Sequence, residues 1–404
     1  MKRFLIGLVL LVVAAVAGLL IYVASIDWNL HKDKIAEQFL EATGKRIVFE
    51  GPVSFKILPS PYLVASRVKI YNPAIKDQPL VEIKNLVANL ELFPLLHKNF
   101  EVSRMVLENP NISVEVDDEG RLNWQNDLTP EQKNKIEEAQ VKLNSVSLEK
   151  ATVTFDDPTR DINFQLENLN GEVIADGMFG PFHVEGNYIK DNNPEGFALS
   201  VGKLSDSFST TLNLVVTHPQ SESYVRFDGS FMLANKVLNG NMIVESKKLQ
   251  DFVKANFKSF ELRSEYDYPL ALTFDLAANE KQFNLSNMVI KYGETQGAGS
   301  MQIPVNDGLA KGSDVIRPRV DMAFNFTDLN LDPIVYTVDD FIKTYKKGDV
   351  VYAPESRLDW LVDVKSLRTQ YNGQPVKNFE ASFDVIDDRL ALNSLSAVLP
   401  GDTD

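Results

Sequence analysis

Side chains capable of catalysis or metal binding are few and scattered in this sequence. The chain contains no cysteine, which excludes disulfides, thiolate catalysis and cysteine-ligated metals. Its four histidines are His31, His97, His183 and His218. None of them has a partner at the spacing that metal sites or catalytic triads use. The sequence therefore predicts neither a metal site nor histidine-based catalysis.

Two pairs of adjacent carboxylates are the remaining candidates for acid and base chemistry. Asp156 and Asp157 precede Pro158, which indicates a turn, and Asp339 and Asp340 lie in a predicted helix, where they fit a solvated face. The sequence also has no glycine-rich phosphate loop and no nucleophile elbow. We therefore expect a protein that is not an enzyme and that uses no cofactor.

Composition limits the classes of protein that remain. With 404 residues, of which 44% are hydrophobic and 24% charged, the chain is folded and long enough for several domains or a repeat array. The net charge of −15 argues against binding to nucleic acid and against electrostatic docking on anionic lipid.

The first segment predicts a membrane anchor. Residues Phe4 to Ile26 form a run of 23 residues without a charge. As a helix this run is about 34 Å long, which is enough to cross a hydrocarbon core of about 30 Å. Lys2 and Arg3 precede it, so the N-terminus is expected in the cytoplasm and the body outside. A cleaved signal peptide is the alternative, but the apolar run continues well past its candidate cleavage site at Ala15–Ala17.

The body after the anchor is predicted to be mainly β. An amphipathic helix is expected at Asn29–Ala42, ended by Gly44, and three further helices near Pro130–Val141, Lys247–Phe257 and Asp332–Lys347. Elsewhere apolar residues alternate with polar ones in about 18–20 short runs, separated by Gly, Asn, Asp and Pro. In the run Val81–Leu92 the apolar phase slips between Ile83 and Leu86, which indicates a β-bulge.

One face of these strands is apolar throughout, and something must cover it. An ordinary β-sandwich would cover it with a second sheet, whereas a curled open sheet would leave an apolar groove for a ligand. The few short helices favour the groove. The residues expected to face a common groove are Val153, Phe155, Phe164, Leu166, Phe227, Phe231, Phe274 and Phe324.

Several short motifs, in this order after an apolar N-terminal segment, carry a resemblance to a known family. They are Thr43–Arg46, Gly51 with Val53–Phe55, Leu58–Pro61, Val68–Asn72, Leu92–Leu96, Leu107–Ile112, Gly120–Trp124, Val146–Leu148, Ala151–Asp157 and Leu169–Gly171. With these motifs the chain resembles the AsmA family of bacterial envelope proteins, which are similar to chorein-type bridge proteins.

The resemblance implies a protein of the bacterial inner membrane whose periplasmic body is a long, curved, repeating β-groove. The implied function is phospholipid transfer toward the outer membrane, in support of its biogenesis and integrity, with phospholipid and the inner membrane as partners. A non-enzymatic scaffold that influences outer-membrane protein assembly, and so binds envelope proteins, is the alternative.

The expected division of the chain follows from the same resemblance. It has an anchor (1–26), an N-terminal groove domain (27–128), a helical spacer (129–142) and a repeating groove region (143–404). Leu395–Gly401 resembles the start of a further repeat, so we expect this chain to be the membrane-proximal part of a longer bridge.

Overall fold

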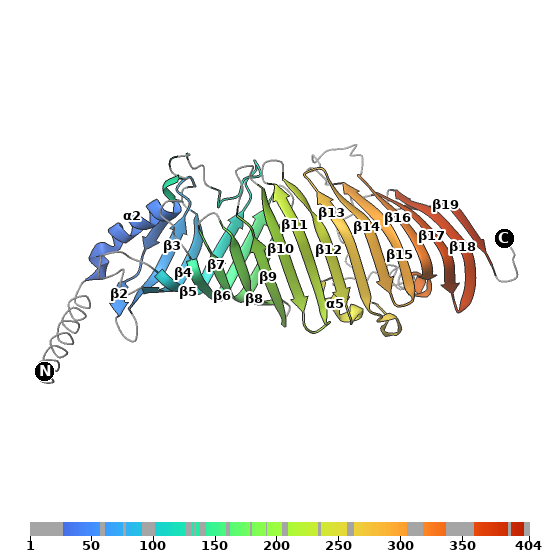
Figure 1. Cartoon of the computed structure of the whole chain (residues 1–404), viewed down its shortest axis with the longest axis horizontal. Coiled ribbons are helices and arrows are strands. Elements are labelled where there is room, and N and C mark those ends of the chain that lie inside the picture. Colours follow the sequence, from blue (N-terminus) through green and yellow to red (C-terminus); the bar gives the residue numbers. More distant parts are fainter. Residues whose placement is uncertain are drawn as a thin grey trace, which may run out of the picture. The chain divides into compact units, whose positions relative to one another are not determined.

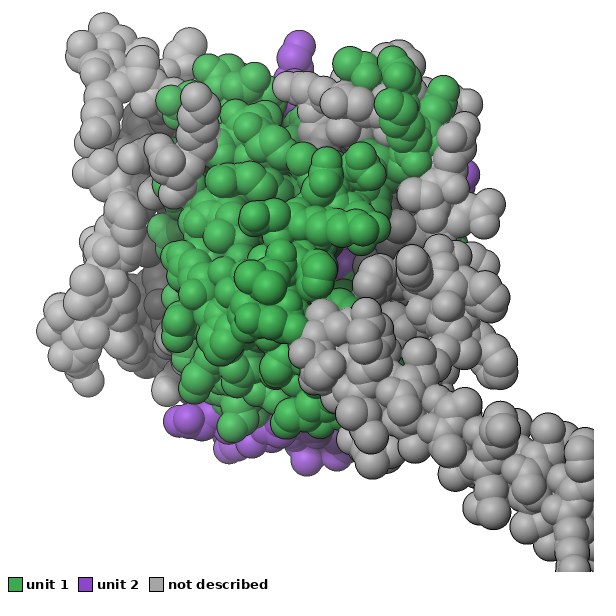
Figure 2. All heavy atoms as spheres, turned by 90° about the vertical axis from the view of Figure 1, so that its left-hand side faces the viewer, with its two compact units in different colours: residues 1–190 green, residues 191–404 purple. Residues whose placement is uncertain are grey.

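The structure is a computed structural model. It describes residues 27–56, 61–75, 78–90, 102–125, 129, 131, 134–136, 143–158, 162–177, 180–190, 192–203, 209–232, 236–256, 262–304, 318–336, 359–386 and 389–399. The chain forms two compact units, residues 1–190 and residues 191–404, which Figure 2 shows in different colours. Each unit is described by itself below.

Unit 1 begins with two short helices and continues as a sheet. The helices are η1 (Trp28–His31) and α2 (Lys32–Thr43). The strands are β1 (Arg46–Phe49), β2 (Val53–Lys56), β3 (Tyr62–Tyr71), β4 (Pro79–Leu90), β5 (Val102–Glu115), β6 (Leu143–Asp157), β7 (Ile162–Ala175) and β8 (Phe182–Lys190). Both β1 and β2 pair antiparallel with β3, and from β4 onward each strand pairs with the one before it.

The pairing of β5 with β6 is parallel, whereas the other pairings of unit 1 are antiparallel. A parallel pair requires the chain to return along the sheet before the second strand starts. The long connection between Glu115 and Leu143 makes this return possible. The predicted spacer helix lies here, and its described residues, 131 and 134–136, are helical.

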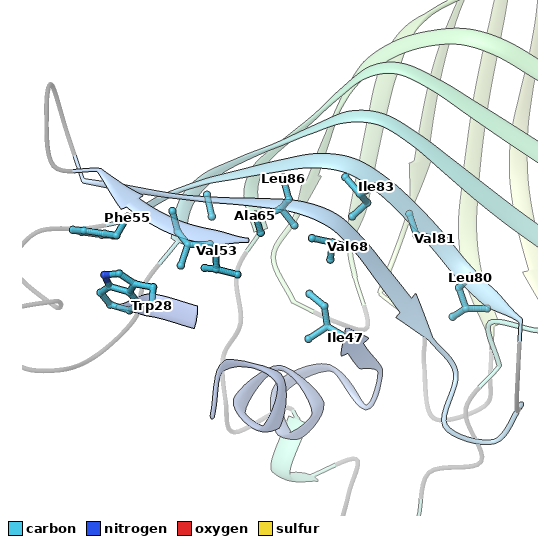
Figure 3. Packing of buried hydrophobic residues seen from close by; sticks show 12 residues of the cluster. Trp28, Ile47, Val53, Phe55, Ala65, Val68, Leu80, Val81, Ile83 and Leu86 are labelled. Atoms are coloured by element: carbon cyan, nitrogen blue, oxygen red, sulfur yellow. The ribbon is translucent and has the colours of Figure 1, made fainter. Parts of the chain in front are cut away.

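The start of unit 1 is a compact core under helix α2. Gly44 ends the helix in the left-handed conformation with φ 68°, and its N–H donates to the Leu40 carbonyl. On α2, Ile35, Ala36 and Phe39 pack against the core, whereas Leu40 is 41% exposed. Figure 3 shows the buried side chains that strands β1 to β4 contribute, with the Trp28 ring beside Phe55.

A row of irregular residues crosses the sheet of unit 1. Residues in the left-handed conformation occur inside four strands, at Arg67, Asn109, Lys150 and Asn168. Pairing places them in neighbouring positions: Arg67 and Asn109 flank the same point of β4, and Lys150 lies beside Asn109 across the parallel pair. We call this row the bulge seam. At Lys150 and Asn168 the register also shifts by one residue, and extra residues of this kind bend strands and increase their twist. At Arg67 and Asn109 the register with β4 does not shift.

The predicted phase slip of β4 lies on the bulge seam. Ile83 and Leu86, three residues apart, are both buried, with exposures of 2% and 6%. The slip is therefore real, but the left-handed residues are on the adjacent strands, at Arg67 and Asn109.

The described part of unit 2 is a succession of eleven strands with short helical segments between some of them. The strands are β9 (Asn193–Val201), β10 (Ser209–His218), β11 (Ser223–Met232), β12 (Val237–Ser246), β13 (Leu270–Ala278), β14 (Gln282–Tyr292), β15 (Thr295–Pro304), β16 (Arg319–Asn330), β17 (Asp359–Tyr371), β18 (Gln374–Ile386) and β19 (Arg389–Val398). The helices are α5 (Leu249–Asn256) and the single turn η3 (Ser264–Tyr266). Figure 1 shows strands β10 to β19 side by side in chain order.

Neighbouring strands of unit 2 are neighbours in the chain. All consecutive pairs from β9 to β19 are antiparallel except β16–β17, which is parallel and follows another long connection. The described strands of unit 2 therefore form one continuous sheet, and they include no second sheet that could cover one of its faces.

The mainly β, repeating architecture is confirmed, and the 19 strands found among the described residues fall within the expected number. The expected helix near Lys247–Phe257 is α5, and that near Asp332–Lys347 is described only at residues 332–336, which are helical. The predicted anchor, Phe4 to Ile26, lies outside the described residues. Among the described residues, no helix is both long and apolar enough to span a bilayer.

Candidate apolar binding surface

One row of side chains crosses unit 2 and is apolar on every strand. The pairing register connects its members from strand to strand, with Met288 joining the row across a bulge in β14. We call it the apolar row: Leu199, Leu214, Phe227, Met242, Phe274, Met288, Gly299, Phe324, Val364, Ala381 and Leu395. Three of the predicted groove residues, Phe227, Phe274 and Phe324, belong to it.

The rows on either side of the apolar row extend the same surface. On one side of the apolar row, two residues away on each strand, the register joins a second row of apolar residues: Val216, Val225, Val244, Leu272 and Ile290. Since side chains two residues apart share a face, all of these belong to one apolar face. Phe231, also predicted, lies on this face opposite Leu238.

The reverse face of unit 2 is mostly polar. Asn213, Asp228, Asn241 and Asp275 lie opposite one another on successive strands. Asn241 donates to the Asp275 carboxylate, at 3.3 Å. The two faces therefore differ in chemistry as the alternation predicted, although the reverse face also carries apolar residues such as Val289, which is 45% exposed.

The apolar face is only partly protected from solvent. Phe227 and Phe274 are buried, with exposures of 4% and 8%, but Leu214, Met242 and Phe324 are half-buried. In the core of unit 1, by contrast, Val53, Val68 and Ile83 of β2 to β4 are at most 2% exposed. The apolar face of unit 2 thus has apolar area that its own described residues do not cover.

Aromatic rings lie against glycines on this face. Gly229 and Gly240 are directly opposite each other on β11 and β12. A Cβ atom on either would come within 2.6 Å of Cζ of Phe227, so that ring lies over the bare backbone. Phe324 covers Gly299 in the same way. These rings therefore shield the backbone of the sheet at the two glycine positions and at Gly299.

The four groove residues predicted in unit 1 form two directly opposed pairs. Val153 on β6 faces Leu166 on β7, and Phe155 faces Phe164. The Phe155 and Phe164 rings stack with their centroids 5.1 Å apart. Phe164 is 49% exposed, so this end of the two strands presents aromatic surface to solvent. These two pairs continue the apolar residues Ile112 and Val114 of β5, and a groove common to all eight predicted residues stays a prediction.

The family motifs at the start of the chain close the other end of unit 1. Lys45 Nζ donates to the Trp124 carbonyl at 2.7 Å, and Asn72 Nδ2 donates to the carbonyls of Asn123 and Gln125 at 2.7 and 2.8 Å. Trp124 in turn packs against the core and donates from Nε1 to the Ser113 carbonyl. These contacts tie the segment after β5 to β1 and β3, so the motif residues are structural.

The Lys45 ammonium is the most perturbed of these groups. The residue is 8% exposed, and burial lowers its pKa to about 8 because the charged form loses hydration. The hydrogen bond to a neutral carbonyl restores only part of that hydration. Lys45 thus holds Trp124 in place, and the free-energy cost of burying its ammonium group depends on pH.

Two of the histidines each contact one glutamate. His183 lies 3.5 Å from Glu185 on the surface, and His218 is buried in contact with Glu195. His97 lies outside the described residues. The described part of the chain contains no group of three or more His, Asp or Glu side chains placed to hold a metal.

Comparison with known proteins agrees with the motifs. The model of the AsmA family matches residues 1–267, which is more than half of the chain. The chain belongs to the AsmA family. Part of it is also similar to Protein AsmA of Escherichia coli (strain K12), with 29% identity over 108 residues. No solved structure matches the chain significantly.

The similarity to the curated relative is partial. It covers 27% of this AsmA-family chain and 17% of the Escherichia coli protein. The family assignment thus confirms the expected resemblance.

Proposed function

We propose that the apolar face binds the acyl chains of phospholipids and conducts them along the body of an envelope protein anchored in the inner membrane. The observation that carries this proposal is the apolar row, which is uninterrupted across eleven strands and partly accessible. Membership of the AsmA family and the mainly β fold are compatible with it.

The energetics favour such a surface as a lipid path. A two-tailed phospholipid has roughly 30 methylenes, each costing about 0.8 kcal/mol in water, so full exposure of its tails costs on the order of 20–25 kcal/mol. An apolar face removes most of this cost without any catalytic group. It lowers a barrier in both directions equally, so the direction of transfer has to come from elsewhere.

Site-specific photo-crosslinking tests the proposal in cells. A benzophenone amino acid placed at Leu214 on the apolar face should form phospholipid adducts, and one placed at Asn213 on the reverse face should not. The two sites are adjacent on β10, so they share local stability and expression. Adducts to a polypeptide at Leu214, without lipid, would favour the scaffold function; equal lipid labelling at both positions would refute a lipid path.

A further inference from the structure

The first turn of the body is fixed to the sheet rather than free to move as a linker. The Trp28 ring is 7% exposed and stacks on Phe55 with centroids 5.1 Å apart (Figure 3). Asn29 Oδ1 accepts from the Val53 N–H at 2.9 Å, and Lys32 Nζ donates to the Gly51 carbonyl at 2.6 Å. Residues on both sides of Leu30 are therefore held by β2 and the segment before it.

This fixed turn follows the predicted anchor almost immediately. Only Asp27 separates Trp28 from Ile26, the last residue of the uncharged run. Consecutive Cα atoms span at most about 3.6 Å along a chain, so the Cα of Leu30 lies within about 14 Å of that of Ile26. The headgroup layer on each side of a bilayer is about 5–8 Å thick. A span ending at Ile26 therefore keeps η1 in or next to this layer.

The side chain that this turn presents is apolar. Leu30 is 80% exposed, more than any other large hydrophobic residue among the described parts of the chain. A single exposed leucine is unremarkable in water. Here, however, the leucine is held at a membrane surface by contacts on either side of it.

We propose that η1 docks on the periplasmic leaflet of the anchoring membrane, with the Leu30 side chain inserted between lipid headgroups. The proposal rests on the anchor that belongs to the proposed function. Docking fixes the distance of unit 1 from the bilayer, so unit 1 contacts the membrane surface instead of moving freely on a flexible linker.

Charge does not provide this contact. The exposed residues around Leu30 include Asp27 and Asp33 as well as His31 and Lys34, so acidic and basic groups are mixed. The docking is thus apolar, and it should be equal on zwitterionic and anionic membranes.

The absence of cysteine permits a direct test on the full chain. Leu30→Cys is labelled with the fluorophore NBD, reconstituted into phosphatidylcholine vesicles and exposed to doxyl-labelled lipid. Leu367→Cys is the matched control, because Leu367 is a 64% exposed leucine on β17. We expect blue-shifted emission and roughly twofold quenching at position 30, unchanged by added phosphatidylglycerol, and neither effect at position 367.

The outcomes separate docking from anchoring. If the label at position 30 behaves like that at position 367 while the chain resists carbonate extraction, docking is wrong and the anchor stands. If carbonate extracts the chain, the anchor is wrong and the docking proposal falls with it.

Discussion

On the apolar face, a charged substitution at a buried residue would test folding, whereas one at a half-buried residue would test lipid binding. Phe227 is buried against Gly229 and Gly240, so a carboxylate in its place would be an unpaired buried charge and would unfold the strand. Phe231, on the same face of β11, is only half-buried. It is therefore the better position at which to separate lipid binding from folding.

Phe231→Asp should reduce lipid transfer strongly while the protein stays folded. A carboxylate there has to be dehydrated whenever an acyl chain passes, which opposes binding. Ser230→Asp adds the same charge one residue earlier on the exposed reverse face, and it should leave transfer unchanged. Transfer of fluorescent phospholipid between vesicles measures both, with circular dichroism as the folding control. Equal loss in the two variants would contradict a one-sided lipid surface.

The buried ammonium of Lys45 should make stability depend on pH. The pKa of Lys45 is lowered to about 8 in the folded chain, against 10.5 in the unfolded chain. Between these values the unfolded state binds more protons, so stability rises with pH across this window. At about 1.36 kcal/mol per pKa unit, the gain is on the order of 3 kcal/mol.

Urea unfolding at pH 7.5 and pH 10 measures this gain. Lys45→Met keeps the side-chain volume and removes the titrating group, so the stability of wild type relative to the variant should increase as pH rises. A constant difference would show that the Lys45 ammonium stays charged in the folded state.

Alternation of residue types was sufficient to assign side chains to faces, because a strand has a period of two. It identified Phe227, Phe274 and Phe324 before the register joined them. It did not show which of them would be buried, because burial depends on the glycines of neighbouring strands. Gly229 and Gly240 become informative only once β11 and β12 are known to pair.

At the scale of elements, bulges keep the apolar face continuous where the sequence breaks its alternation. On β14, Leu285 and Met288 both lie on the apolar face, although they are three residues apart. The extra residue is Asn287, with φ 50°. It donates to the Asp275 carboxylate at 2.8 Å on the reverse face.

Deleting Asn287 should therefore be tolerated. The strand would then alternate regularly, with Met288 and Ile290 still on the apolar face, and the loss should be about 1 kcal/mol for the hydrogen bond. Deleting Asn241 from the regular strand β12 would instead turn every later residue of that strand to the wrong face. Thermal unfolding should show a small shift for the first variant and no cooperative transition for the second. The reverse order would refute this role of Asn287.

The elements that sequence reasoning missed depend on long-range pairing. The strands themselves were predicted, since each alternates over many residues. The parallel pairs β5–β6 and β16–β17 were not, because a long connection does not reveal the direction in which the next strand joins. The bulge seam was visible only as a phase slip between Ile83 and Leu86, and its left-handed residues required the backbone.

At the scale of the whole molecule, the orientation of the chain across the membrane can be measured with single cysteines. Glu119→Cys, in the exposed turn after β5, should react with a membrane-impermeant maleimide in cells whose outer membrane is permeable. A cysteine inserted after Met1, which leaves Lys2 and Arg3 in place, should react only after lysis, since these positive residues keep it in the cytoplasm. Labelling of this cysteine before lysis would overturn the predicted orientation.

The nearest-neighbour pairing of unit 2 also has an evolutionary consequence. Because each strand from β10 to β18 contacts the strands before and after it in the chain, a hairpin can be duplicated or lost without rebuilding distant contacts. Adding or removing two strands leaves the next strand with the same direction and with its apolar side chains on the same face. It changes the width of the sheet by about 9.6 Å. Genes encoding such sheets can thus change the width of the sheet in steps of two strands.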